Sequence, residues 1–91
     1  MDSILALAKE YNLKVIEDCS HAHGAMYKGK KCGSFGDVGC FSMQGSKVLA
    51  AGEAGILVTR SREYYERALA LGHYDKLEKL GESSPYSKYY L

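Results

Sequence analysis

Two short apolar runs that end in polar residues most constrain the fold of this chain. The first run, 15–18, ends in the carboxylates Glu17 and Asp18. The second, 38–43, is followed by a glycine-serine break and then by Lys47. Apolar runs of this length with polar boundaries are typical of buried strands in an α/β sheet. Because ligands bind beyond the carboxyl ends of such strands, we expect Asp18 and Lys47 to face one organic cofactor.

The N-terminal segment predicts a helix that leads directly into a strand. Asp2 is expected to cap the helix, and Asn12, which tolerates left-handed backbone, is expected to end it. The helix has an apolar face at helical spacing, made of Ile4, Leu5, Leu7, Ala8 and Tyr11. A strand over 13–16 follows at once. This order predicts an α/β fold: part of a mostly parallel sheet with flanking helices and a β-hairpin.

The middle of the chain predicts the β-hairpin and two further strands. The hairpin covers 25–31 and has a charged, exposed turn. Glycines then recur at every third residue, at Gly33, Gly36 and Gly39. This spacing is neither a Walker loop nor a dinucleotide-binding turn, so it indicates a tight irregular turn. The strands are expected at 38–43 and 56–59.

A second helix is predicted after the last strand. Ser61 is the expected N-cap, and Gly72 the expected stop. The residues expected on its inner face are Tyr65, Ala68, Leu69 and Leu71. A short helical turn is predicted over 74–80.

Composition and charge argue against several classes of function. The chain has 91 residues, of which 46% are hydrophobic and 25% charged, and its net charge is +1. This size predicts at most one small domain. The longest basic run is Lys30-Lys31, so no nucleic-acid partner is expected. No apolar run approaches the roughly 18 residues of a membrane span, so no membrane partner is expected either.

Asp18, Lys47 and Ser42 each allow a functional and an ordinary interpretation. Asp18 can hold a positively charged group, such as a protonated ring nitrogen, or it can be a helix cap or surface ion pair. Lys47 has apolar neighbours in the sequence, and desolvation lowers a lysine's pKa so that its amine can attack a carbonyl. Taken alone, however, Lys47 is an ordinary solvated lysine. Ser42 can donate to a phosphate, although strand serines commonly bond to neighbouring backbone.

A zinc site is the alternative suggested by the sulfur and imidazole groups. Its ligands would be Cys19, His21, His23 and Cys32. The chain lacks a Cys-x-x-Cys pair, so we expect no metal and a histidine used for orientation or stacking. Three cysteines at irregular spacings argue against disulfides and favour a reducing, cytoplasmic setting.

In combination these motifs resemble the DegT/DnrJ/EryC1/StrS family of sugar and cyclitol aminotransferases. The resemblance is carried by five segments in the family's order and spacing, namely 15–25, 27–30, 33–42, 46–47 and 52–55. The family has the aspartate aminotransferase fold (fold type I) and uses pyridoxal 5′-phosphate. Residues 41–44 and 46–49 look closer to the cyclitol branch than to the nucleotide-sugar branch.

The resemblance implies a role for each candidate residue. Lys47 would hold pyridoxal 5′-phosphate as a Schiff base and then move the proton between substrate and cofactor. Asp18 would pair with the pyridinium nitrogen, and His21, where many members have glutamine, would lie beside the ring hydroxyl. Ser42 would bind the phosphate. The implied reaction moves an amino group from glutamate or glutamine to a keto sugar or cyclitol. A related dehydratase branch has histidine in place of the lysine, so Lys47 favours transamination.

The resemblance also implies that the chain is part of a longer protein. Residues 1–91 are expected to be a partial cofactor-binding large domain, truncated at both ends, with a poorly ordered tail over 82–91. Members of the family are homodimers that complete their sites across the interface, so the isolated chain is predicted to be inactive. A non-catalytic truncated product or assembly subunit is the alternative hypothesis. One departure is Ala54, where the family usually has glycine; a methyl group is tolerated there only at negative φ.

Overall fold

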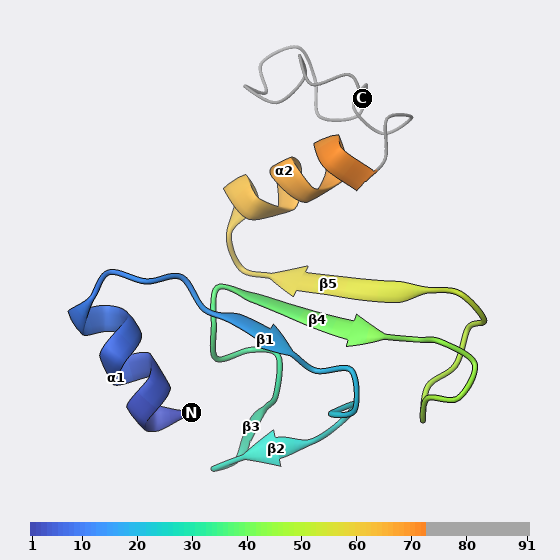
Figure 1. Cartoon of the computed structure of the whole chain (residues 1–91), viewed down its shortest axis with the longest axis horizontal. Coiled ribbons are helices and arrows are strands. Elements are labelled where there is room, and N and C mark those ends of the chain that lie inside the picture. The colour runs from blue at the N-terminus through green and yellow to red at the C-terminus, as the bar shows by residue number, and fades with distance from the viewer. Residues whose placement is uncertain (73–91) are drawn as a thin grey trace. The chain divides into compact units, whose positions relative to one another are not determined.

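A three-stranded sheet organises the first of two units into which the structure, a computed structural model, divides. The first unit is Met1–Thr59 and the second begins at Arg60; the structure describes residues 1–72. Strand β4 (Val38–Ser42) lies between β1 (Ile16–Asp18) and β5 (Gly55–Thr59) (Figure 1). The β1–β4 pairing is parallel and the β4–β5 pairing is antiparallel. The predicted α/β class is therefore confirmed, whereas the mostly parallel character of the complete sheet stays a prediction.

The strand register decides which side chains share a face of the sheet. Asp18 pairs with Cys40 in the parallel ladder, and Ser42 lies two residues further along β4. Side chains alternate between faces along a strand, so Asp18 and Ser42 lie on one face. Glu17 and Phe41 lie on the opposite face. The register thus brings two of the predicted site residues to the same side of the sheet.

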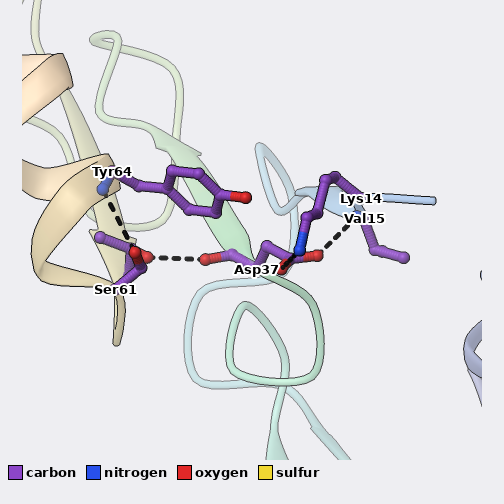
Figure 2. Close-up of polar contacts among 6 residues, drawn as sticks. Lys14, Val15, Asp37, Ser61 and Tyr64 are labelled. Atoms are coloured by element: carbon purple, nitrogen blue, oxygen red, sulfur yellow. Dashed lines mark hydrogen bonds and ion pairs between the residues drawn. The ribbon is translucent and has the colours of Figure 1, made fainter. Parts of the chain in front are cut away.

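The predicted position of the first strand, 13–16, is wrong, because β1 begins at Ile16 and includes both carboxylates. Asp37 explains the difference. Its Oδ2 accepts the backbone N–H of Val15 at 2.9 Å, and its own N–H donates to the Val15 carbonyl at 2.9 Å. Figure 2 shows Asp37 beside Val15 and Lys14. These contacts engage the backbone of Val15, so the ladder with β4 starts one residue later.

The predicted β-hairpin is confirmed. It consists of β2 (Met26–Tyr27) and β3 (Lys30–Lys31), which pair antiparallel. Its two central residues, Lys28 and Gly29, have φ values of 48° and 75°. Positive φ at both positions is the type I′ turn that matches the twist of the flanking strands.

Helix α1 (Asp2–Glu10) differs from its prediction at one end. The predicted Asp2 cap is wrong, since Met1 occupies the cap position and the Asp2 carboxylate instead pairs with Lys28. The predicted left-handed residue at the other end is confirmed, because Asn12 has φ 52°. Much of the expected apolar face is solvent-exposed, including Leu7 at 53%, and only Ala8 is buried in this helix.

Helix α2 (Arg62–Gly72) belongs to the second unit. The Ser61 hydroxyl accepts the N–H of Tyr64 at 3.3 Å, which confirms the predicted N-cap (Figure 2). The expected inner face is wrong in part: Ala70 is the buried residue, whereas Leu71 is 61% exposed. Neither α1 nor α2 combines the length and the apolar character that a bilayer-crossing helix requires. The turn predicted over 74–80 and the tail over 82–91 lie outside the described residues.

The glycine turn is explained by close backbone contacts. A Cβ atom added at Gly39 would lie 2.5 Å from the carbonyl oxygen of Gly33, and one added at Gly36 would lie 2.6 Å from that of Val15. Both separations are too short for non-bonded atoms, and both neighbours are backbone. The turn can therefore pack against β1 and β4 only where side chains are missing.

We expect Gly39→Ala to lower the free energy of unfolding by about 1–3 kcal/mol, because the new methyl group forces backbone to shift. Gly45→Ala is the matched control, since a Cβ atom there meets nothing within 4 Å. Urea denaturation of the two variants compares them directly. Equal stability of the two variants would contradict the close approach at Gly39.

Candidate active site

Asp18 ends β1 with its carboxylate held by one residue. Its Oδ1 accepts the Ser20 hydroxyl at 2.6 Å and the Ser20 N–H at 3.0 Å. These two bonds lower the pKa of Asp18, and the charges of His21 and Lys47 lower it further, against a smaller opposing effect of desolvation. Asp18 is exposed, and its Oδ2 accepts no hydrogen bond from residues 1–72. The side chain is thus an ionised carboxylate with one oxygen available.

Lys47 lies in the loop between β4 and β5 and meets a residue 26 positions away. Its Nζ is 2.9 Å from Nε2 of His21, and its backbone N–H donates to the Gln44 carbonyl at 2.9 Å. The apolar surroundings expected from the sequence are not formed by its next neighbours. Val48 is 91% exposed and Leu49 is 53% exposed, because the loop turns them to solvent. The lysine is nevertheless half-buried.

Ser42 ends β4 on the face that carries Asp18. Its hydroxyl oxygen accepts the N–H of Gln44 at 3.4 Å, which leaves the hydroxyl hydrogen available for another acceptor. The site therefore combines a carboxylate, an imidazole–amine contact and a strand-end hydroxyl from three separate segments. No contact joins Ser42 directly to Lys47 or His21 among the interactions of residues 1–72.

The zinc hypothesis has no ligand cluster to support it. Within residues 1–72, no three His, Cys, Asp or Glu side chains are grouped so that they could hold a metal ion. His23 instead packs on Phe41, with ring centroids 5.5 Å apart, and neither of its buried ring nitrogens has a partner in this part of the chain. Cys19 is buried, and this desolvation, with the nearby Glu17 carboxylate, raises the pKa of its thiol.

Glu17 has a role that sequence reasoning missed. It is only 8% exposed, and its carboxylate accepts the N–H groups of Gly33, Phe35 and Gly36 at 2.6–2.7 Å. Burial opposes ionisation, but these donors outweigh it and lower the pKa of Glu17. The strand alternation was the available signal, because adjacent residues of a strand face opposite sides. Glu17 binds the glycine turn, and Asp18 is left facing the site.

The substitution at Ala54 is compatible with the loop. Within residues 1–72, the non-glycine residues with positive φ are Asn12 and Lys28, so Ala54 keeps negative φ. Its carbonyl accepts the N–H of Met43 at 2.8 Å and continues the contact between the ends of β4 and β5. Ala54 therefore has the negative φ that its methyl group requires.

Comparisons with known proteins agree over nearly the whole chain. The model of the DegT/DnrJ/EryC1/StrS aminotransferase family matches residues 1–87. The L-glutamine:2-deoxy-scyllo-inosose aminotransferase of Streptoalloteichus tenebrarius is 52% identical over 67 residues, which are 74% of this chain and 16% of that enzyme. GDP-perosamine synthase of Escherichia coli O157:H7 is 49% identical over 69 residues, which are 76% of this chain and 19% of that enzyme.

A solved structure gives the same result. The aminotransferase from Psychrobacter cryohalolentis, known from X-ray diffraction, matches with a TM-score of 0.80 and 35% sequence identity, over 92% of this chain and 22% of that one. The chain spans 12–20% of the length of the first curated relatives it matches. Sequence and structure therefore agree that this chain belongs to the DegT/DnrJ/EryC1/StrS aminotransferase family.

Proposed function

We propose that the protein containing this chain is a pyridoxal 5′-phosphate-dependent aminotransferase. The observation that carries the proposal is the contact between Lys47 Nζ and His21 Nε2, which are 2.9 Å apart. Both residues lie close enough to Asp18 to lower the pKa of its carboxyl group. A carboxylate at the end of β1 and an amine in the loop after β4 are the two groups that such an enzyme requires. We call residues 1–91 within that protein the family segment, and the complete reading frame that contains them the whole protein.

The side chains of the site fit this cofactor chemically. Asp18 is ionised and has a free oxygen, which suits a positively charged ring nitrogen. Ser42 has a hydroxyl hydrogen to give to a phosphate oxygen. Lys47 has a primary amine, which suits an aldehyde. These properties support the residue assignments implied by the family resemblance.

Each residue then has a definite task. When bound, the cofactor supplies a carbonyl that accepts the amino group and a ring that withdraws electrons. Asp18 would pair with the ring nitrogen and favour its protonated form, Ser42 would hold the phosphate, and His21 would orient the ring. Lys47 would hold the aldehyde through its amine and would move a proton at Nζ. General acid–base catalysis of this kind contributes about 10²–10⁴-fold to a rate.

The proposed substrates are an amino donor and a cyclic ketone. We propose glutamine or glutamate as the donor and a keto cyclitol as the first acceptor to test, with a nucleotide-linked keto sugar as the second. Several relatives are named as L-glutamine aminotransferases of scyllo-inosose or 2-deoxy-scyllo-inosose. The GDP-perosamine synthase among the relatives supports including the sugar.

The direct test is amino transfer by the whole protein. We expect ¹⁵N from amino-labelled glutamine or glutamate to appear in the product amine when scyllo-inosose or 2-deoxy-scyllo-inosose is supplied with the cofactor. Borohydride treatment followed by peptide mass spectrometry should find the reduced cofactor on Lys47. A folded, cofactor-loaded protein that transfers no label to either class of acceptor would overturn the proposed reaction.

The isolated family segment is proposed to be inactive. It spans 12–20% of the length of its first relatives, and the parent enzyme is proposed to be a cytoplasmic homodimer. The alternative, a non-catalytic truncated product or assembly subunit, rests on the same small share of the relatives' length. Translation of the flanking DNA separates the two: continuous family sequence supports the enzyme, and stop codons on both sides support the alternative.

A further inference from the structure

The two residues that meet in the site each follow a serine with the same local structure. Ser20 precedes His21, and its N–H and hydroxyl both donate to Asp18 Oδ1, at 3.0 and 2.6 Å. Ser46 precedes Lys47, and its N–H and hydroxyl both donate to Gln44 Oε1, also at 3.0 and 2.6 Å. In both turns the acceptor lies two residues before the serine. We call these the Ser20 turn and the Ser46 turn.

The Ser20 turn fixes the carboxylate at the end of β1. The last ladder bond of this strand runs from the Cys19 N–H to the Cys40 carbonyl at 2.8 Å. The N–H of Ser20 comes next and has no strand partner, so Asp18 Oδ1 accepts it. With the hydroxyl bond added, Oδ1 is fully engaged and only Oδ2 remains for a ligand. Loss of the hydroxyl would free the carboxylate to rotate.

The Ser46 turn fixes the backbone that carries Lys47. Gln44 accepts two successive N–H groups, that of Ser46 on its side-chain oxygen and that of Lys47 on its backbone carbonyl at 2.9 Å. Gly45 adds no side chain to stiffen this turn. The direction in which Lys47 leaves the loop therefore depends on the bonds between Ser46 and Gln44. A side chain aimed in this way meets His21 at 2.9 Å.

We propose that Ser20 and Ser46 are positioning residues, one for the Asp18 carboxylate and the other for the Lys47 amine. The proposal rests on the proposed function, because that function defines the tasks of Asp18 and Lys47. It adds that a different serine positions each of these two residues. Ser20 acts on the interaction with the ring nitrogen, and Ser46 acts on the attack at the aldehyde. Each support can therefore be removed alone.

Two cofactor analogues test the roles of Ser20 and Ser46 separately in the whole protein. 1-Deazapyridoxal 5′-phosphate lacks the ring nitrogen, so the ratio of its dissociation constant to that of the cofactor measures the Asp18 interaction. We expect Ser20→Ala to reduce this ratio about three- to tenfold, the worth of one or two net hydrogen bonds. We expect Ser20→Thr, which keeps the hydroxyl, to restore it. Ser46→Ala should leave the ratio unchanged.

The second analogue, 4-deoxypyridoxine 5′-phosphate, lacks the aldehyde and cannot bond to Lys47. We expect Ser46→Ala to bind it normally but to attach the cofactor to Lys47 about three- to tenfold more slowly, as followed by borohydride trapping. Ser34→Ala is the matched control for both serines. Its hydroxyl donates to the Lys31 carbonyl at 2.6 Å, and its neighbours Gly33 and Phe35 bond to Glu17 rather than to Asp18 or Gln44.

A third readout needs no cofactor. Ser20 is the main cause of the lowered Asp18 pKa, while the charges of His21 and Lys47 stay in both variants. Carbon NMR of the Asp18 carboxyl should therefore show a higher pKa in Ser20→Ala and an unchanged pKa in Ser46→Ala and Ser34→Ala. The Ser20 assignment is overturned if Ser20→Ala changes neither the Asp18 pKa nor the ratio of the two dissociation constants. The Ser46 assignment is overturned if Ser46→Ala attaches the cofactor to Lys47 at the normal rate. Failure of the wild-type protein to bind the cofactor would overturn the proposed function, while the Asp18 titration would still test Ser20.

Discussion

Lys47→Ala should abolish covalent retention of the cofactor and reduce amino transfer by about 10²–10⁴-fold or more in the whole protein. The reason is that the proposed function gives this one amine two tasks, attachment to the aldehyde and transfer of the proton, and alanine can do neither. Borohydride reduction followed by peptide mapping measures the first task. Single-turnover transfer of labelled nitrogen measures the second.

Controls separate this loss from a general effect of removing a lysine. Lys31→Ala removes an exposed hairpin lysine and should leave both measurements unchanged. Added methylamine should restore part of the rate of Lys47→Ala, since a small amine can enter the space left by the side chain. If Lys47→Ala still retained reducible cofactor on the family segment, the assignment of Lys47 would be wrong.

Glu17→Gln should lower the free energy of local opening around the glycine turn by about 2–4 kcal/mol. The carboxylate accepts three backbone N–H groups from the turn, from Gly33, Phe35 and Gly36. Glutamine offers a single acceptor oxygen, and its amide N–H₂ would face a backbone donor. Hydrogen exchange at the Phe35 and Gly36 amides measures the loss within the whole protein. Glu10→Gln, an exposed glutamate of α1, is the matched control and should leave these amides protected.

The same contact predicts a dependence on pH. The folded-state pKa of Glu17 is below its ordinary value of 4.5. Its contribution to stability is therefore complete above that ordinary value and disappears as the pH falls through the lower folded-state pKa. Protection of the Phe35 amide should decrease in acid in the wild-type protein and depend much less on pH in Glu17→Gln. Parallel acid profiles of the two proteins would contradict this assignment.

Local backbone chemistry was readable from the sequence. A β-hairpin over 25–31, a left-handed helix end at Asn12 and an N-cap at Ser61 were predicted, and the structure confirms all three. Each of these features depends on residues within a few positions of one another. A glycine that accepts positive φ, or a hydroxyl that accepts a nearby N–H, does so in almost any surroundings.

Features that depend on a distant partner were predicted wrongly. Asp2 suits a helix cap, but Lys28 pairs with its carboxylate across 26 positions. The first strand begins later than its apolar residues suggest, because Asp37 engages the backbone of Val15. Val48 is apolar, yet it is turned to solvent rather than around Lys47. In the first two cases a contact between separated segments overrides the local preference, and in the third the loop leaves an apolar side chain in solvent.

The candidate site likewise combines features that could be predicted from the sequence with contacts that could not. The family and the chemical types of Asp18, His21, Ser42 and Lys47 could be predicted from the sequence alone, because the order and spacing of motifs are properties of the chain itself. Contacts between separated segments appear only in the tertiary structure: His21 meets Lys47, and Glu17 turns away from Asp18 to bind the glycine turn. The structure also shows that Ser20 bonds to Asp18 and Ser46 to Gln44. The contacts of His21 and Glu17 depend on the parallel register of β1 and β4 and on the direction of each loop, which arise from hydrogen bonds between segments that are far apart in the chain.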